Sequence, residues 1–185
     1  TGRPCVSIWK HRSFEWVGRD LPVTELIDTV HRGRAIFGPE GGVTFGGGEV
    51  TLQAPALGVA IHAVLREGID VTVESNASTD GFRRLIGGPV RLYADLKAVD
   101  PALHLEWTGA PNDAVLENIA RAAAGHERLA IRIPFVTGFN TELAEQRRIA
   151  EYLHALRRAD LRVEILRLHH AGAPKYAALD QPYPM

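Results

Sequence analysis

Residues with chemically useful side chains recur along this 185-residue sequence, and each group lies within or just after a short apolar run. A glycine run with a glutamate comes first, and two more carboxylates, a lysine, an arginine and a histidine follow. These residues are Gly47, Gly48, Glu49, Glu74, Ser75, Asp95, Lys97, Arg132 and His169. Glycine backbone can approach a ligand closely, and the Glu49 carboxylate supplies an acceptor for a ligand ammonium group. The pattern predicts a ligand site if the fold gathers these residues.

Each group also has a plainer interpretation. The glycines at 46–48 fit an ordinary turn between a strand and a helix, and no Gly-Lys-Ser/Thr follows them, which excludes a phosphate loop. Lys97 is either a surface lysine, a partner in a structural ion pair with Asp95, or a Schiff-base nucleophile of an aldolase-like barrel. His169 and His170 are adjacent on a strand and point to opposite faces, so only one of them is expected in a site.

The elements that must position these residues follow from the apolar pattern. Helices are expected at 21–30 with Thr24 as cap, at 52–67, at 79–85, from the cap Asn112 to 125, and from Asn140 or Thr141 to 156. Strands are expected at 42–45, 69–73, 90–96, 129–136 and 161–168. Alternating strands and helices predict an α/β fold with a parallel sheet, either doubly wound or an incomplete barrel. Ligands of such folds bind at the carboxyl ends of the strands, where the polar groups lie.

Composition narrows the class of protein. Hydrophobic residues make up 45% and charged residues 23%, which is usual for a globular domain. The net charge of -1 gives no reason to expect a nucleic-acid partner, and no apolar run is long enough to predict a membrane span. The single cysteine, Cys5, fits a reducing cytoplasm and excludes a metal site built from three or four cysteines of this chain.

Several segments resemble one enzyme family. Residues 42–53 (GVTFGGGEVTLQ) are similar to the GGE segment of the radical-SAM activating enzymes of glycyl-radical enzymes, the pyruvate formate-lyase activating enzyme type. Further similar segments follow in the family's order, at 95–97 (DLK), 107–109 (WTG), 116–118 (LEN), 131–134 (IRIP), 138–140 (GFN), 164–169 (EILRLH), 175–176 (KY) and 183–184 (YP). The family usually has serine at the position of Gly46 and often proline at Val50. The resemblance covers roughly residues 20–185 and implies a partial (β/α) barrel with about five of six parallel strands.

The resemblance also implies roles for the polar residues. Gly47, Gly48 and Glu49 would hold the amino group of S-adenosylmethionine (SAM). Glu74, Ser75 and Asp95 would lie near the SAM carboxylate and a monovalent cation. Lys97, Arg132 and His169 would line the same pocket. Ser75 and Ala77 depart from the family's usual Asp-Thr-Asn-Gly, which weakens the prediction of the cation.

A radical-SAM enzyme also needs a 4Fe-4S cluster, which the family holds with a Cys-x3-Cys-x2-Cys motif that this sequence lacks. The resemblance implies that residues 1–20 are the tail of a preceding, ferredoxin-like segment, that residues 21–185 are the barrel body, and that the parent protein carries the cysteines upstream. In that parent, cleavage of SAM gives a 5′-deoxyadenosyl radical, which abstracts hydrogen from a glycine of a partner glycyl-radical enzyme. Flavodoxin or ferredoxin would supply the electron, and this chain alone would be inactive. The alternative is a cluster-free paralogue that only binds SAM or a partner protein.

Overall fold

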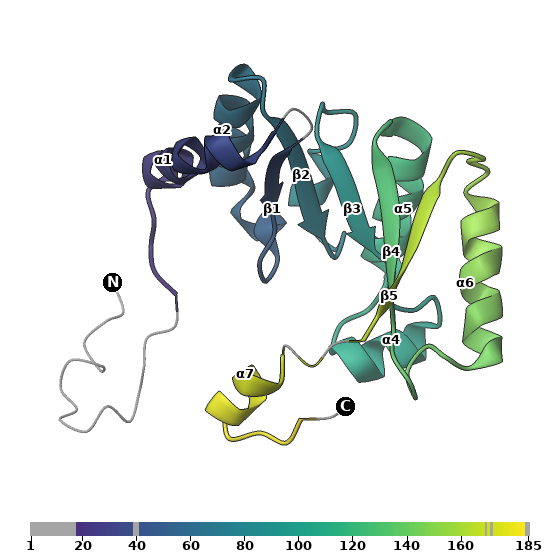
Figure 1. The fold of residues 1–185 in the computed structure, drawn as a ribbon. Helices are drawn as coiled ribbons and strands as arrows, with labels where there is room; N and C mark the ends of the chain where they lie inside the picture. Colours follow the sequence, from purple (N-terminus) through teal and green to yellow (C-terminus); the bar gives the residue numbers. More distant parts are fainter. Residues whose placement is uncertain (1–17, 39–40, 169, 171, 184–185) are drawn as a thin grey trace.

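The strands lie side by side in one parallel sheet, in the order in which they occur along the chain (Figure 1). They are β1 (Gly42–Phe45), β2 (Asp70–Ser75), β3 (Arg91–Asp95), β4 (Leu129–Phe135) and β5 (Arg162–Arg167). The computed structural model describes residues 18–38, 41–168, 170 and 172–183. All five strand predictions are confirmed, with ends that differ by one or two residues.

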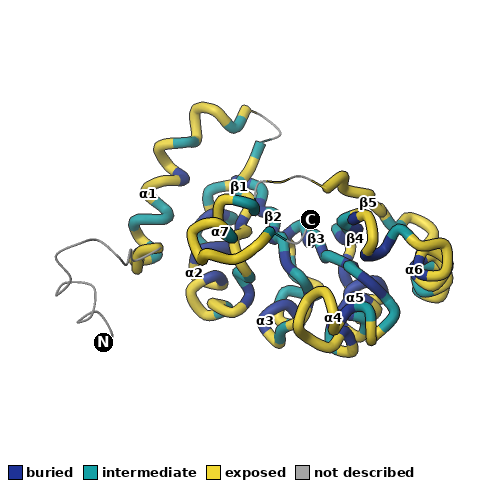
Figure 2. Tube along the Cα trace, turned by 90° about the horizontal axis from the view of Figure 1, so that it is seen from below, coloured by how far each residue is buried: buried dark blue, intermediate teal, exposed yellow. Residues whose placement is uncertain are grey.

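Helices connect successive strands and cover one face of the sheet. They are α2 (Ala54–Arg66), α3 (Asp80–Arg83), α4 (Pro101–Thr108), α5 (Asp113–Gly125) and α6 (Leu143–Ala155), and the 3-10 helix η2 (Val50–Gln53) precedes α2. Figure 2 shows the strands as an arc with these helices around its outside. Right-handed crossovers between neighbouring strands put every helix on the same side. The structure confirms an α/β partial barrel, and the described sheet does not close.

The two faces of the sheet differ sharply in composition because side chains alternate along a strand. The helix-covered face contributes Val71, Val73, Leu92 and Ile131, which are fully buried. The opposite face carries no helix and consists mainly of charged and polar side chains. We call it the open face, and it includes Thr72, Glu74, Arg91, Tyr93, Asp95, Arg132 and Glu164. The apolar side chains of the sheet are therefore buried on the helix-covered face, and the polar side chains of the open face are available for contacts.

The remaining helices lie at the two ends of the chain. α1 (Val23–Gly33) and the short η1 (Arg34–Ile36) precede β1, and an ion-pair cluster ties them to α2. In that cluster Glu67 accepts hydrogen bonds from Arg34, at 3.1 Å, and contacts His31 Nε2 at 2.6 Å. α7 (Ala173–Ala178) follows β5 and lies below the carboxyl ends of the strands in Figure 1. Among the described residues, no helix is long and apolar enough to cross a membrane.

Two of the expected helix caps are wrong, and a third holds its expected position without a capping bond. α1 begins at Val23 after Pro22, so Thr24 lies inside its first turn. α6 begins at Leu143 with Glu142 as N-cap, and neither Asn140 nor Thr141 caps it. Asn112 occupies the N-cap position of α5, but its side chain bonds to backbone carbonyls of another loop. Short polar side chains satisfied by distant backbone groups give no local capping bond.

Candidate functional site

The glycine run leaves β1 at the carboxyl end of the sheet and exposes its backbone. Gly46, Gly47 and Gly48 are all exposed, and Gly47 has a φ of 133°, which disfavours any residue with a side chain. A Cβ placed on Gly47 or Gly48 would meet no atom within 4 Å, whereas one on Gly46 would lie 3.7 Å from Glu74 Oε2. The run is therefore an open backbone surface beside the Glu74 carboxylate.

The Glu49 carboxylate is occupied by groups of the protein. Its Oε1 accepts hydrogen bonds from Thr51 N at 3.0 Å, from Ser75 Oγ at 2.8 Å and from the Thr51 hydroxyl. Its Oε2 accepts from Asn76 N at 2.8 Å. Glu49 thus caps η2 and ties the exit of β1 to the exit of β2. Little acceptor capacity of Glu49 remains for a ligand.

Arg132 connects three strands across the open face. Its Nη1 donates to Glu74 Oε1 on β2 at 2.5 Å, and its Nε donates to Glu164 Oε2 on β5 at 2.9 Å. The guanidinium carbon lies 3.6 Å above the ring centre of Tyr93 on β3, which fits a cation–π contact. The arginine therefore spans from β2 to β5 with the ring of Tyr93 beneath it.

Asp95 and Lys97 form an ion pair at the exit of β3. Lys97 Nζ lies 3.5 Å from Asp95 Oδ2, and each side chain keeps about a third of its surface exposed, 33% and 34%. Burial raises the pKa of the Asp95 carboxyl above its usual value, although the Lys97 ammonium opposes this shift. The structural ion pair weighed from the sequence is therefore present, and both groups remain accessible.

The structure brings some of the predicted site residues together and separates others. Glu74, Asp95 and Arg132 share the open face with Lys97 just beyond it, and the exposed glycines lie at the same edge. Ser75 points to the opposite face, where it is buried and donates to Glu49. His169 lies outside the described residues. Among the residues that the structure describes, no three histidine, cysteine or acidic side chains gather as a metal site.

Two residues that contact Arg132 on this face, Tyr93 and Glu164, were missing from the sequence-based prediction of the site. Tyr93 lies two positions before Asp95, and Glu164 pairs in register with Arg132. A signal for Tyr93 was present in the sequence, because residues two apart on a strand share a face. Glu164 could be found only by knowing the register of β5.

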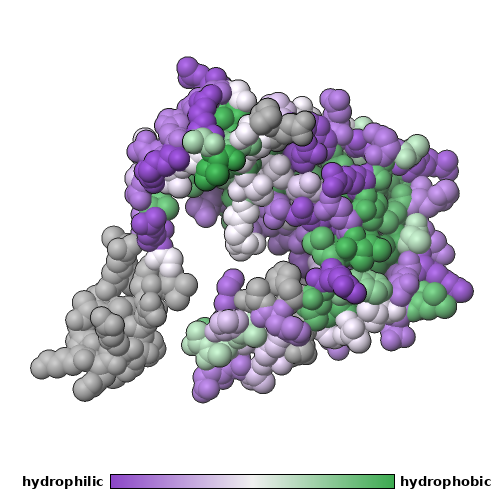
Figure 3. Space-filling view, viewed as in Figure 1, coloured by the Kyte–Doolittle hydropathy of each residue, from purple (hydrophilic) through white to green (hydrophobic). Residues whose placement is uncertain are grey.

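The surface of the open face is mainly polar, as its residues indicate. Figure 3 shows hydrophilic residues across the middle of the face and a hydrophobic area beside them over β4 and β5. Phe135, Leu166 and Leu168 are exposed large hydrophobic residues at the carboxyl ends of β4 and β5. A cavity of about 620 Å³ lies between α1, α2 and the end of β1, and Gly46 of the glycine run is part of its lining. Its lining combines apolar side chains such as Leu26 and Leu57 with the polar side chains of Arg19, Asp20 and Gln53.

Comparison with known proteins gives one family and several relatives. The profile of the Radical SAM superfamily matches residues 7–164. The 4-hydroxyphenylacetate decarboxylase activating enzyme of Clostridioides difficile is 28% identical over 97% of this chain and 57% of its own length. The choline trimethylamine-lyase activating enzyme of Oleidesulfovibrio alaskensis is 29% identical over 91% of this chain and 56% of its own. The chain therefore spans a little over half the length of these relatives.

A solved structure extends the comparison to the fold. A domain of a pyruvate-formate lyase-activating enzyme from Bacteroides vulgatus superposes with a TM-score of 0.62 at 26% sequence identity. The match covers 75% of this chain and 91% of that domain. The open parallel sheet with helices on one face is thus shared with that domain.

Proposed function

The chain belongs to the radical SAM superfamily, and we propose that it forms the body of an activating enzyme for a glycyl-radical enzyme. The observation that carries the proposal is the agreement between the relatives and the site. The matched relatives are named as activators of several different enzymes, and part of the residue set expected for SAM, namely Glu74, Asp95, Lys97 and the exposed glycines, lies together at the carboxyl end of the sheet.

SAM fits the chemistry of this edge. When bound, SAM supplies the sulfonium group from which the radical chemistry of the superfamily starts. The exposed backbone at Gly47 and Gly48 offers carbonyl acceptors for the SAM ammonium group, and the Glu74 and Asp95 carboxylates add negative charge nearby. Lys97 offers a cation for the SAM carboxylate.

The structure changes the roles proposed for three residues. Glu49 and Ser75 are assigned to holding the glycine run and the β2 exit, since they bond to each other. Arg132 is assigned to fixing Glu74 on the open face, because two of its nitrogens already donate to carboxylates. A role for His169 in the SAM pocket remains a prediction. A monovalent cation near Glu74 and Asp95 also remains a prediction.

The 4Fe-4S cluster does not fit the residues of this chain. The sequence has one cysteine, Cys5, whereas the cluster needs three thiolates. We propose that the ligands of the cluster belong to another part of the whole protein. The division at residue 20, the glycyl-radical enzyme partner, the flavodoxin or ferredoxin reductant and a cytoplasmic location are parts of the same proposal.

Calorimetric titration of the chain with SAM tests the proposed site. We expect measurable binding, and we expect Lys97→Met to weaken the affinity by about tenfold, equivalent to about 1.4 kcal/mol. Arg121→Met on the exposed side of α5 is the control and should leave the affinity unchanged. Absence of SAM binding to the folded wild-type chain would remove the basis of the proposal.

A second experiment separates the activating enzyme from the cluster-free alternative. The whole protein is isolated anaerobically, reconstituted with iron and sulfide, and mixed with SAM, a reductant and, in turn, glycyl-radical enzymes of the kinds that the matched relatives activate. Electron paramagnetic resonance should then record a glycyl radical on the partner. SAM binding without any radical, and without cluster absorbance, would favour the cluster-free paralogue.

A further inference from the structure

A buried asparagine holds the exits of β3 and β4 together. Asn140 is fully buried, and its Nδ2 donates to Lys97 O at 2.8 Å and to Pro134 O at 2.7 Å. Its Oδ1 accepts from Val136 N at 2.9 Å. One amide group thus bridges the backbone that follows β3 and the backbone at the end of β4.

Two other buried side chains anchor the rest of the segment that follows Lys97. Asn112 Nδ2 donates to Ala98 O at 3.1 Å and to Val99 O at 2.9 Å. The Glu145 carboxylate accepts from Val99 N at 2.5 Å and from Asp100 N at 3.3 Å. Residues 97–100 are therefore fixed at each residue by side chains from α5, α6 and the β4–α6 connection.

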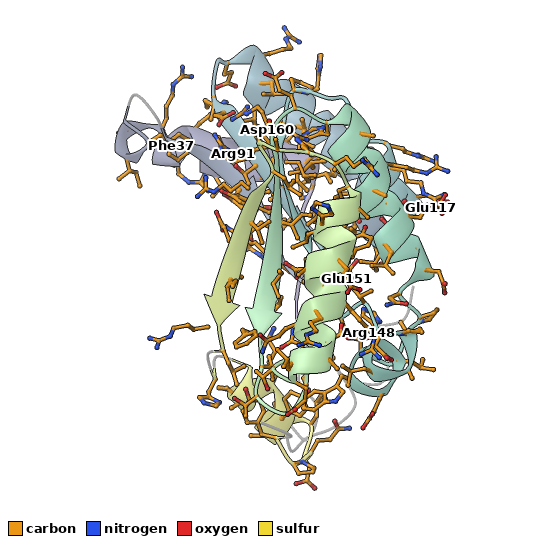
Figure 4. The ribbon with its side chains drawn as sticks, turned by 90° about the vertical axis from the view of Figure 1, so that its right-hand side faces the viewer. Phe37, Arg91, Glu117, Arg148, Glu151 and Asp160 are labelled. Atoms are coloured by element: carbon orange, nitrogen blue, oxygen red, sulfur yellow. The ribbon has the colours of Figure 1, made fainter. Side chains whose placement is uncertain are left out.

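Glu145 is itself held in place at the start of α6. It is 2% exposed, and Arg148 Nη1 lies 3.5 Å from its Oε2. Figure 4 labels Arg148 near the end of α6 that lies beside the carboxyl ends of the strands. The anchors of residues 97–100 thus belong to the outer helical layer, whereas Lys97 Nζ lies at the ligand edge.

The position of Asn140 matters because the strand ladder ends just before it. Leu96 N donates to Arg132 O at 2.8 Å, which is the last backbone bond between the two segments before they separate beyond β3 and β4. Beyond that bond, Asn140 is the side chain that joins Lys97 O to Pro134 O. Asn140 therefore fixes the backbone position of Lys97. The flexible Lys97 side chain can reach Asp95 only if its backbone lies in a suitable position.

Simple satisfaction of buried polar groups would explain the same bonds without any role for Lys97. Asn118 illustrates that simpler case, because it is also fully buried and its Nδ2 donates to Ala77 O at 2.7 Å. Asn118 serves the loop after β2 and has no bond to residues 97–100. Comparing the two asparagines separates a general loss of stability from a specific effect on Lys97.

We propose that Asn140 is a positioning residue, which places the Lys97 ammonium beside Asp95 by holding Lys97 O against the exit of β4. The reason Lys97 matters for ligand binding rests on the function proposed above. The placement of the Lys97 ammonium itself is independent of that function and can be measured without a ligand.

The chain has three lysines, Lys10, Lys97 and Lys175, so ¹³C-dimethylation of the folded protein gives a lysine NMR spectrum with few signals. Lys97→Arg assigns the Lys97 signal, and Asp95→Asn records its position without the carboxylate partner. In Asn140→Ala we expect the Lys97 signal to move towards the Asp95→Asn position while the Lys175 signal stays in place. Asn140→Ser, which keeps a shorter hydroxyl group, should give a smaller displacement and serves if the alanine variant does not fold.

Asn118→Ala is the matched control, since it also removes a buried amide anchor. It should leave the Lys97 signal unmoved. An unchanged Lys97 signal in folded Asn140→Ala or Asn140→Ser would overturn the proposal, as would an equal displacement in Asn118→Ala. SAM affinity, measured separately, should fall by about tenfold in Asn140→Ala. If the wild-type chain fails to bind SAM, the proposed function fails, and the NMR comparison still decides the role of Asn140.

Discussion

Arg132 forms ion pairs with two carboxylates on the open face, a face that the described helices do not cover. Arg132 lies between Glu74 and Glu164, so removing the cation takes this partner from both carboxylates, although Glu164 keeps its ion pair with Arg162 at 2.7 Å. The Arg132 side chain is 21% exposed, which means that water screens this arrangement only in part. The charge balance of the face therefore depends strongly on one residue.

Substitution of Arg132 measures that dependence. We expect Arg132→Met to lower the free energy of unfolding by about 1–3 kcal/mol, because two charge-assisted hydrogen bonds are lost and the Glu74 carboxylate loses this cation. Arg121→Met removes an exposed pair with Glu117 on α5 and should change stability by about 0.5 kcal/mol or less. Urea unfolding compares the two. A similar small change in both variants would contradict the bridging role of Arg132.

Asp95 should make the chain less stable as pH rises, in contrast to most aspartates. Burial raises the pKa of its carboxyl above 3.8, so the folded state binds more protons than the unfolded state between these two pKa values. The stability that protonated Asp95 contributes is lost as pH rises through the folded pKa. Asp95→Asn should therefore gain stability relative to wild type as pH rises from 3.8 through the folded pKa of Asp95.

Asp70 is the control for that experiment because its shift has the opposite sign. Hydrogen bonding from Arg128 lowers the pKa of the Asp70 carboxyl, so its contribution is present above 3.8 and lost as pH falls. Asp70→Asn should lose stability relative to wild type as pH rises towards 3.8, and the difference should then stay constant at higher pH. The same pH trend in both variants would refute the assignment of Asp95.

Most of the site residues could be found from the sequence because they end predicted strands, as Asp95 and Lys97 do. Ser75 and Glu49 could not be assigned in this way. Ser75 follows Glu74 directly, so the alternation of a strand turns it to the helix-covered face. The bond between Ser75 and Glu49 depends on how β1 and β2 lie side by side, which no local pattern specifies.

Two short helices beside the site, η2 and α3, lie in very close backbone contact. η2 and α3 meet where a Cβ on Gly81 would lie 2.0 Å from Thr51 O, so this crossing requires glycine. Thr51 Oγ1 contacts Thr79 Oγ1 at 2.6 Å, and Thr79 caps α3. The crossing therefore links the cap of α3 to Glu49 and the glycine run.

Gly81→Ala should separate these two elements. We expect it to lower the free energy of unfolding by about 1–3 kcal/mol, because the added methyl group has no space against backbone. Gly58→Ala in the middle of α2, where a Cβ meets nothing within 4 Å, should raise it by about 0.5–1 kcal/mol. Thermal or urea unfolding measures both. Equal stability of wild type and Gly81→Ala would contradict the close approach.

The element predictions succeeded where hydrophobic periodicity was strong and failed where capping was needed. α4 was missed although Asp100 and Pro101 form a typical start, with the Asp100 side chain accepting from Leu103 N at 3.0 Å, and Gly109 ends the helix at a φ of 73°. Asn140 was assigned to a cap, but burial and two distant carbonyls determine its conformation. Tertiary bonds of this kind leave no periodic trace in the sequence.

At the scale of the whole molecule, the described sheet is open at both edges. β5 is one edge, and its residues Val163, Ile165 and Leu166 are 39%, 67% and 37% exposed. Exposed apolar residues on an unpaired strand favour pairing with another chain. The isolated chain is therefore expected to pair with a second copy of itself along β5.

Sedimentation velocity at several protein concentrations checks this expectation. Wild type should shift towards dimer as concentration rises, and Ile165→Lys should remain monomeric, because a charged residue disfavours strand pairing. Leu52→Lys on η2, an exposed apolar residue away from the sheet edge, is the control and should behave like wild type. A wild-type chain that stays monomeric at every concentration would contradict the prediction.

The account as a whole depends on where SAM binds, and NMR mapping of backbone amides during SAM titration locates it most directly. We predict that the largest changes occur at residues 46–49, at 74–76 and at 95–98, with little change in α5 or α6. Changes confined to the cavity between α1 and α2, or no changes at any SAM concentration, would contradict a SAM site at the carboxyl ends of the strands.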